Sequence, residues 1–526
     1  MKALSYTNFQ SDGDIKERQT LLFNRLHDDI YKPDYVFIAD QNGWPGDWEG
    51  RTILALVSLS TVLKEEAAYV DGIIANLKDH LNEKGYLGHI LPEGVADEQQ
   101  LSGHSWLLRG LCEYYNYKKD EGVLEIIKSI TKNLFLPLRA NYTNYPILPE
   151  QRVYEGHESG SVAGRVGDWY ISTDTGCAFI PLDGLSAVYE LMLEKDQALA
   201  NELKGTLHHM IDKFMTIPFT EICVQTHATL TGLRGIMRFY KHSKDLTLLS
   251  FAKKIYDLYI NEGMTANYAN YNWFGRPEWT EPCAIVDSFM LACQLFIETK
   301  EQRYVDYAKF ILYNGIYRHQ RDNGGFGTDN CPGPEDDFVT VASYEAYWCC
   351  TMRAGEGLHA VSKYSLVENE DEILMLYPVS GIYNINNIKM HVKTDFPASG
   401  NIEISILENN NDGNVTLEVL YSAKDVDTNF MHNEKSRKIT ITKDKTEYFI
   451  DLKLPLYYKL AEGKHNKKDK KMLMQGPVIL GSLDENVKLG DIKDVVKEEF
   501  TPLYNLYKMP KTWMERNKVY ILFDTH

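Results

Sequence analysis

Apolar residues recur every three or four positions over roughly the first 365 residues of this 526-residue chain. The segments 185–192 and 230–240 show this spacing clearly, and it is typical of helices that bury one face. About a dozen such segments follow one another, with short polar breaks such as 243–245 and 300–302 between them. Paired helices in such a succession predict an (α/α)6 toroid, a ring in which the starts of the inner helices surround a cleft.

The spacing of apolar residues changes near residue 371. From there on they alternate with polar residues, as in 388–392, 402–406 and 415–419, and turn-forming residues separate these runs. A period of two predicts strands that bury one face. We therefore expect an α+β multidomain protein, with the toroid in residues 1–370 and a β-sandwich in residues 371–526. A few N-terminal residues are expected to join the sandwich.

Charge and composition narrow the class of protein. The formal net charge is −18 and the carboxylates are spread along the chain, which argues against a nucleic-acid partner. The N-terminus lacks the apolar segment of a signal peptide, and no apolar run reaches the ~18 residues that a membrane span needs. Eight cysteines, unevenly placed, suit a reducing compartment. We expect a cytoplasmic protein without a membrane partner, and a homodimer is left open.

Two cysteine-bearing motifs stand at predicted helix starts. One is Glu281-Pro282-Cys283 and the other is Cys349-Cys350. Pro282 suits the first turn of a helix, and a thiol at a helix N-terminus is favoured as a thiolate. One carboxylate and three thiols suit a four-ligand zinc site. The alternative is that the cysteines are small buried hydrophobic residues. We expect that role for the cysteines on other apolar segments: Cys112, Cys177, Cys223 and Cys293.

The Glu-x-Cys motif followed by a Cys-Cys pair resembles glycoside hydrolase family 127 and its relatives, the β-L-arabinofuranosidase-like proteins with the DUF1680 domain. Short similarities at 85–88 and 474–481 extend the resemblance along most of the chain. The resemblance implies a zinc ion bound by Glu281, Cys283, Cys349 and Cys350. It also implies that Cys349 attacks the anomeric carbon. The sequence from Gly275 to Cys283 looks like that of a divergent branch of this family.

The chain differs from this family where the general acid/base should be. Relatives carry a Gly-Glu upstream of Glu-x-Cys, whereas residues 263–277 contain no carboxylate. We expect Glu278 to donate the proton, with Glu345 as the second choice. By analogy with paired carboxylates, the acid should lie about 5–5.5 Å from the attacking atom. Cys331 also falls in this region, either as a further ligand or as a residue of the pocket wall.

Four residues are predicted to bind the sugar: His104, His227, Trp48 and Trp273. The two histidines stand at helix starts where relatives have a substrate-facing histidine, although a histidine in the core is the commoner case. The tryptophans offer aromatic faces that cover apolar C–H surface. The long segment 140–175 is expected to line a site or an interface.

The leading functional prediction is a retaining glycoside hydrolase of the β-L-arabinofuranosidase type with a zinc-bound cysteine nucleophile. Its substrate would be a furanoside or similar unusual sugar in plant or microbial glycans, presented as an oligosaccharide or a small glycoside. Two alternatives remain open. The toroid could use carboxylates for hydrolysis or elimination while its cysteines are structural. It could also bind glycans without catalysis and keep zinc as a structural clip.

Overall fold

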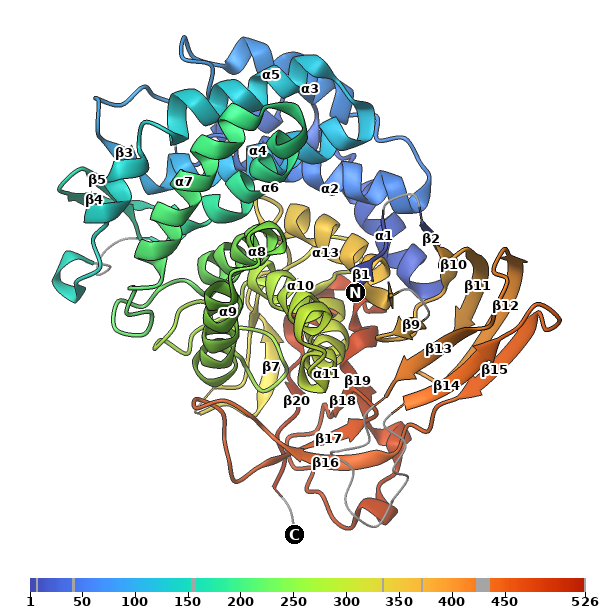
Figure 1. The fold of residues 1–526 in the computed structure, drawn as a ribbon. Helices are drawn as coiled ribbons and strands as arrows, with labels where there is room; N and C mark the ends of the chain where they lie inside the picture. Colours follow the sequence, from blue (N-terminus) through green and yellow to red (C-terminus); the bar gives the residue numbers. More distant parts are fainter. Residues whose placement is uncertain are drawn as a thin grey trace.

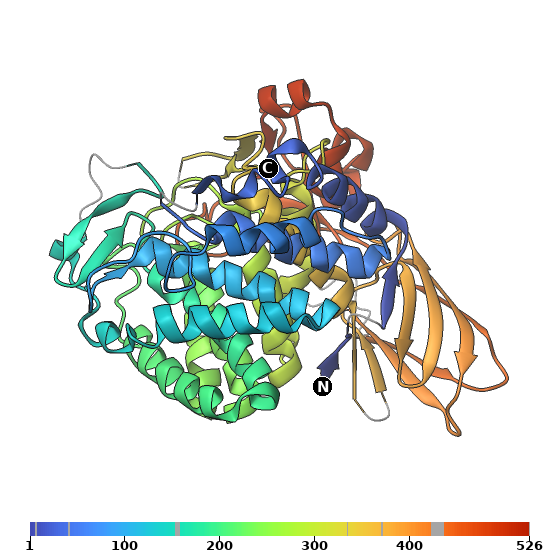
Figure 2. The same cartoon turned by 90° about the horizontal axis from the view of Figure 1, so that it is seen from above.

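The computed structural model describes residues 1–5, 8–39, 43–152, 158–333, 335–369, 372–421 and 436–524. A ring of helices occupies the first two thirds of the chain, and β-sheets follow it (Figure 1). Figure 2 shows the molecule turned by 90°, with the orange strands that follow the helical part at the right. The predicted order, a helical toroid followed by a β-rich region, is confirmed.

The inner ring consists, within the described residues, of six helices: α2 (Asp47–Leu63), α4 (Glu98–Lys118), α6 (Pro181–Lys195), α8 (Thr226–Ser243), α10 (Pro282–Thr299) and α13 (Cys350–Ser365). Each of these helices packs against the next, and α13 packs against α2, which closes the ring. An outer helix covers each of them: α1 (Gly13–Arg25), α3 (Val70–His80), α5 (Glu121–Ile130), α7 (Gln197–Phe214), α9 (Leu246–Leu258) and α11 (Gln302–Phe310). The inner helices are buried on nearly all sides, as expected for the centre of a toroid.

Local sequence sets where the inner helices begin. The Asp97 side chain accepts hydrogen bonds from the first turn of α4, and Pro282 occupies the first position of α10. Gly46 precedes α2 with φ 91°, and a Cβ there would lie 3.0 Å from the carbonyl oxygen of Gly103. Only glycine avoids both the strain and the clash. α10 is long and apolar enough to cross a membrane, but 78% of it is buried in the ring, as in other core helices.

Two five-stranded sheets follow the toroid within the described residues. Their orders are β1-β8-β9-β13-β14 and β15-β12-β11-β10-β2. The strands are β1 (Lys2–Ala3), β2 (Phe9–Ser11), β8 (Leu366–Glu368), β9 (Glu372–Met375), β10 (Gly381–Ile385), β11 (Ile388–Thr394), β12 (Asn401–Asn409), β13 (Val415–Leu420), β14 (Ser436–Ile441) and β15 (Glu447–Asp451). In β11 and β12 every second residue is buried, which is the predicted alternation. β1 and β2 are the N-terminal residues that were expected to join these sheets.

From residue 456 onwards the chain returns to the toroid. It forms a separate four-stranded sheet of β16 (Leu456–Leu460), β17 (Lys471–Gln475), β18 (Val478–Gly481) and β19 (Thr501–Pro502). The last strand, β20 (Val519–Tyr520), pairs with β7 (Phe338–Val341) next to the ring. Asn314 of the ring donates to the Pro477 carbonyl (2.8 Å) and accepts from the Ile479 amide (2.7 Å). Residues 456–526 therefore do not belong to the two five-stranded sheets, and the predicted single sandwich over residues 371–526 extends too far.

The loop between β16 and β17 braces the chain that leads into α10. Asn466 is buried, accepts a hydrogen bond from the Tyr271 hydroxyl (2.9 Å) and donates one to the Met264 carbonyl (3.2 Å). Asn270, next to Tyr271, accepts from the backbone amide of Glu281 (3.0 Å). Through these contacts the loop between β16 and β17 helps to fix the position of Glu281, the first residue of the Glu281-Pro282-Cys283 motif.

Candidate functional site

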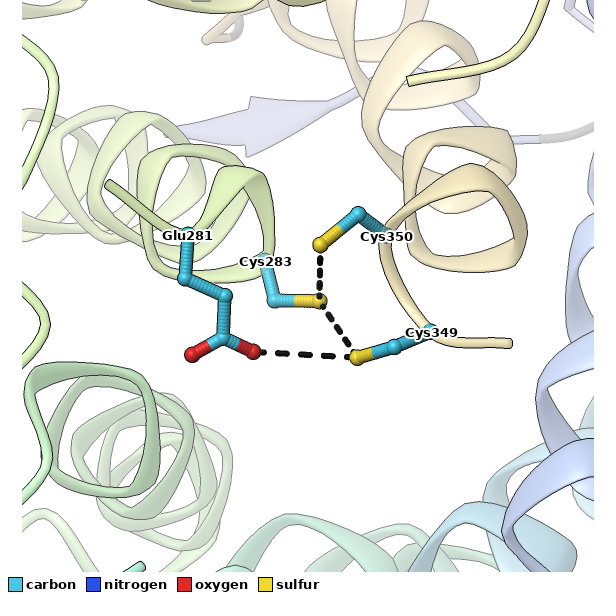
Figure 3. A group of neighbouring side chains, drawn as sticks. All are labelled: Glu281, Cys283, Cys349 and Cys350. Carbon is cyan, nitrogen blue, oxygen red and sulfur yellow. Dashed lines mark hydrogen bonds between the residues drawn. The ribbon is translucent and has the colours of Figure 1, made fainter. Parts of the chain in front are cut away.

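Glu281, Cys283, Cys349 and Cys350 meet where α10 and α13 begin. Their side-chain ligand atoms all lie within 4.8 Å of one another. The Cys283 sulfur is 3.2 Å from that of Cys349 and 3.7 Å from that of Cys350, and a Glu281 oxygen is 3.7 Å from the Cys349 sulfur (Figure 3). Glu281, Cys283 and Cys350 are buried, whereas Cys349 is partly exposed. Residues far apart in the sequence therefore form one cluster, as predicted.

The cluster fits a zinc ion. Zinc favours tetrahedral sites of sulfur, nitrogen and carboxylate ligands, and sulfurs bound at about 2.3 Å lie about 3.8 Å apart across such a tetrahedron. The two sulfur–sulfur distances, 3.2 and 3.7 Å, are close to that spacing. Both motifs stand at helix starts, where the helix dipole favours negative charge. The donor set and its spacing therefore suit a four-ligand metal site.

Cys349 is electrostatically distinct from the other two thiols. Hydrogen bonds with Cys283 and Cys350 hold the pKa of Cys349 well below its usual value, and the positive charge of Arg51 acts in the same direction. Burial raises the pKa of Cys283 and of Cys350 well above the usual value. The partly exposed sulfur is thus the one favoured as a thiolate, which is the form that acts as a nucleophile.

Arg51 supplies a positive charge to the sulfur cluster. Its guanidinium donates to the Cys283 sulfur (3.6 Å) and forms an ion pair with Asp47 (2.9 Å), one turn earlier in α2. It also stacks on the buried Trp106, 4.1 Å from the ring centre. Because Cys283, Asp47 and Trp106 all contact this guanidinium, its positive charge is fixed beside the thiols before a ligand binds.

His227 connects the cluster to a buried ionic network. Its Nδ1 lies 3.3 Å from Glu281 and its Nε2 lies 3.3 Å from Asp287. Burial alone would lower the pKa of His227, but the two carboxylates raise it to about 9. Asp287 in turn pairs with Arg234 (2.7 Å) and Arg353, both of which are buried. The protonated His227 therefore forms an ion pair with Glu281 and helps to fix the position of this carboxylate.

A cavity of about 370 Å³ opens beside the cluster. Its wall comes from the starts of the inner helices and from adjoining loops: Trp44, Asp47, Trp48, Arg51, Ser159, Gly160, Asp174, Ile180, Gln225, His227, Asn272, Trp279, Glu281, Thr328, Ala346, Trp348, Cys349 and Cys350. The predicted cleft at the inner helix starts is thereby confirmed. The segment 140–175 does line it, through Ser159, Gly160 and Asp174; residues 153–157 lie outside the described part.

Two carboxylates besides Glu281 face this cavity. Asp47 is engaged by Arg51, and burial raises the pKa of Asp47 to about 6. Asp174 accepts a hydrogen bond from Ser159 (3.3 Å). Burial and the nearby charges of Glu281 and Cys349 raise the pKa of Asp174 to about 7. Asp174 is thus the cavity carboxylate that most readily carries a proton near neutrality.

The two carboxylates predicted to act as acid lie elsewhere. Glu278 does not line the cavity; its side chain is half exposed and pairs with Arg276 (2.9 Å). Glu345 also lies outside the wall, where it accepts hydrogen bonds from Arg25 (2.9 Å) and Asn323 (2.8 Å). Both predictions therefore need correction on geometry, because neighbouring cations hold these carboxylates away from the cavity.

The predicted sugar-binding residues divide into two pairs. His227 and Trp48 line the cavity, whereas His104 and Trp273 do not. His104 is fully buried; it accepts from the Leu87 amide (2.9 Å) and its Nδ1 bonds with the Gln100 carbonyl (2.8 Å), so it holds a turn in the core. Trp273 is buried beneath the guanidinium of Arg276. These two substrate-contact predictions are corrected.

The remaining cysteines stand apart from the cluster. Cys331 is not among its residues, and burial raises the pKa of that thiol. Cys112, Cys177 and Cys293 are buried, as predicted, whereas Cys223 is only partly so. None of these sulfurs belongs to a candidate metal group within the described residues.

Several residues of the cavity wall were not predicted from the sequence. Asp174 closes a long loop and carries no motif, although the length of that loop was a signal. Asn272 is buried, and neither atom of its side-chain amide has a hydrogen-bond partner among the described residues. Arg51 lies in the first two turns of α2, and its contact with the sulfurs could only be seen in three dimensions.

Comparisons with known proteins agree with this geometry. Residues 220–365 match the family model described as "Beta-L-arabinofuranosidase, GH127 catalytic domain". The whole structure is similar to that of a GH127 β-arabinofuranosidase, with a TM-score of 0.69, 12% identity, and coverage of 100% of this chain and 98% of that chain. It is also similar to a GH127 β-L-arabinofuranosidase from Geobacillus stearothermophilus T6, with a TM-score of 0.67, 12% identity, and coverage of 99% and 100%. No curated protein matches the chain.

At this identity the likeness to solved structures establishes the shared fold. The family match adds the segment that carries both cysteine motifs, and it supports the prediction of a glycosidase. Residues 220–365 thus match the catalytic-domain model of glycoside hydrolase family 127, and the chain shares the fold of solved GH127 structures.

Proposed function

We propose that the protein is a retaining glycoside hydrolase that cleaves β-L-arabinofuranosides or closely related furanosides, with Cys349 as its nucleophile. The observation that carries this proposal is the cluster of Glu281, Cys283, Cys349 and Cys350 beside a sugar-sized cavity, in whose wall Glu281, Cys349 and Cys350 lie. A purely structural metal clip has no need of a cavity on one side. Here the sulfur favoured as a thiolate is also the most exposed of the three.

The reaction takes two steps. In the first, the Cys349 thiolate forms a C–S bond to the anomeric carbon while the glycosidic C–O bond breaks and an acid protonates the leaving oxygen. In the second, water displaces the sulfur and returns its proton to the same residue. A bound zinc ion would supply the positive charge that keeps the sulfur a thiolate and a good leaving group. Arg51 and His227 hold the cluster in place during both steps.

We propose Asp174 as the acid. It shares the cavity wall with Cys349, and its raised pKa leaves it partly protonated near neutral pH. Asp47 also faces the cavity, but its ion pair with Arg51 opposes protonation. After the first step Asp174 is ionised and can take the proton of the attacking water.

Replacing the proposed acid should affect substrates according to their leaving group. Asp174→Asn is expected to lower kcat for methyl β-L-arabinofuranoside by about 10²–10⁴-fold, because the methoxide leaving group needs a proton. The 2,4-dinitrophenyl glycoside should lose far less in its first step, since its leaving group needs none. Added azide should restore turnover and give a glycosyl azide of retained configuration. Steady-state kinetics and product NMR measure both effects.

The same measurements on Glu278→Gln and Glu345→Gln are the matched controls. We expect neither variant to show leaving-group dependence or azide rescue, because neither carboxylate faces the cavity. If Glu278→Gln shows this pattern and Asp174→Asn does not, the assignment of the acid is reversed.

The charges of the wall indicate a neutral substrate. Arg51 is paired with Asp47 and His227 with Glu281, so the described part of the wall leaves no cation unpaired to receive a substrate carboxylate. Among the described residues, Asp174 adds a carboxylate without a cationic partner within hydrogen-bond distance. Asn272 offers a buried amide with no partner in the same part of the chain, which suits a sugar hydroxyl. Hydroxyl-bearing sugars therefore fit this cavity better than uronic acids.

The metal site gives the experiment that tests the proposed function. Protein purified without chelator should contain about one zinc per chain and hydrolyse 4-nitrophenyl β-L-arabinofuranoside. Removal of the metal should abolish hydrolysis, and cobalt added to the metal-free protein should give thiolate-to-metal absorption bands. Cys283→Ser should lose most of the metal, while Cys112→Ala, a buried thiol elsewhere in the ring, should keep it. Full activity without metal would contradict the proposal.

A further inference from the structure

The cavity beside Cys349 is large enough to hold the sugar unit that is released. Its volume of about 370 Å³ lies near the lower end of the ~300–1,000 Å³ range of small-molecule sites. Cys349, Cys350 and Glu281 belong to its wall, so the unit to be released must bind against them. The rest of a glycan, on the leaving-group side of the bond, must then pass the rim of the cavity.

An exposed aromatic residue stands at this rim. Trp348 lines the cavity and is 50% exposed. Among the well-exposed aromatic side chains of the described residues, it alone lines this cavity. Its neighbour Tyr347, 41% exposed, contacts it edge-on with ring centres 4.9 Å apart. Two adjacent exposed rings beside the cavity offer an aromatic surface on which the apolar face of a ligand ring can stack.

Buried groups hold this pair in place. The hydroxyl of the buried Tyr31 donates to the Tyr347 carbonyl (2.8 Å). The Trp48 ring lies 6.1 Å from that of Tyr347 and 6.4 Å from that of Tyr31, and Trp48 also lines the cavity. The exposed rings thus extend a row of packed aromatic side chains. A surface ordered in advance loses little entropy when a ligand covers it.

We propose that Trp348, supported by Tyr347, is the binding platform for the leaving group, either a second sugar ring or an aromatic aglycone. The apolar face of such a ring stacks on the indole, while the unit to be released occupies the cavity. This inference rests on the proposed function, and it adds which leaving groups the enzyme prefers. It makes the protein selective for glycosides with a ring next to the scissile bond over small alkyl glycosides.

The test compares two substrates that differ only in the leaving group. For 4-nitrophenyl β-L-arabinofuranoside, Trp348→Ala should lower kcat/KM about 10-fold, chiefly through a higher KM, because stacking on an aromatic face is lost. The methyl glycoside should change far less, and Trp348→Phe should recover part of the loss. Tyr117→Ala removes an equally exposed ring at the far end of α4 and should affect neither substrate. Equal losses for both substrates in Trp348→Ala would overturn the platform.

Failure of the proposed function is distinguishable from failure of the platform. Wild-type protein that hydrolyses neither glycoside overturns the proposed function. Calorimetric titration of wild-type and Trp348→Ala protein with the same two glycosides then decides the platform by binding alone. Tighter binding of the 4-nitrophenyl compound that depends on Trp348 supports it. No binding by the wild type, or equal binding by both proteins, overturns it.

Discussion

Cys349→Ser is expected to lower kcat for 4-nitrophenyl β-L-arabinofuranoside by at least about 10⁴-fold, as for the loss of other catalytic nucleophiles. A hydroxyl in this position is far less ionised than the Cys349 thiol, whose pKa the neighbouring thiols and Arg51 hold low. It is also a poorer ligand for zinc. Steady-state kinetics measure the loss, and the thermal midpoint shows whether the variant is folded.

Two matched variants separate the roles of the sulfurs. Cys350→Ser removes a buried proposed ligand but leaves the proposed nucleophile, so zinc added in excess should restore part of its activity. Cys112→Ala, whose sulfur lies in α4 away from the cluster, should keep activity within about twofold, like most changes outside a functional site. Activity of Cys349→Ser within 100-fold of the wild type would rule out this sulfur as the nucleophile.

Asp287→Ala should destabilise the toroid by about 3–5 kcal/mol, because it leaves buried cations without their anion. The fully buried Asp287 carboxylate pairs with Arg234 and Arg353 and accepts from the Thr231 hydroxyl (2.8 Å). It also lies 3.3 Å from His227, so its loss should loosen Glu281. Chemical denaturation followed by helical circular dichroism measures the first effect, and zinc affinity measures the second.

The control for this prediction is an ion pair of similar composition on the surface. Asp257 pairs with Arg303 at 2.6 Å, but both side chains are about half exposed. Asp257→Ala should therefore cost less than about 1 kcal/mol and leave zinc affinity unchanged. Asp287→Asn keeps the shape and one hydrogen bond, so its cost should fall between these two. Equal stability of the two alanine variants would contradict the account of the buried network.

The periods of the apolar residues were enough to predict the toroid and the strands that follow it. These signals are local, because each helix or strand must bury one face whatever its neighbours are. The return of the C-terminal segment carried no such signal. Pairing of β20 with β7 joins segments far apart in the sequence, and only the fold brings them together. The extent of the sandwich was overestimated for this reason.

The cluster of Glu281, Cys283, Cys349 and Cys350 could be predicted because these residues fall into two compact motifs with ligand chemistry. The proposed acid, Asp174, could not be predicted in this way. Glu278 was favoured because it is close to Glu281 in the sequence, yet an arginine two residues away holds it outside the cavity. Asp174 comes from another loop and stands out only through its burial and its neighbours. Likewise His104 and His227 have similar sequence contexts, and only hydrogen-bond partners distinguish the core residue from the cavity residue.

Covalent trapping tests the central claim most directly. The protein would be incubated with 2,4-dinitrophenyl 2-deoxy-2-fluoro-β-L-arabinofuranoside, digested, and analysed by peptide mass spectrometry. The fluorine slows both steps, and the activated leaving group allows the first to proceed, so the glycosylated enzyme accumulates. We predict one fluoropentosyl group per chain on the peptide with Cys349, and none in Cys349→Ser. A label on Asp47, Asp174 or Glu281, or hydrolysis without any label on Cys349, would contradict the account.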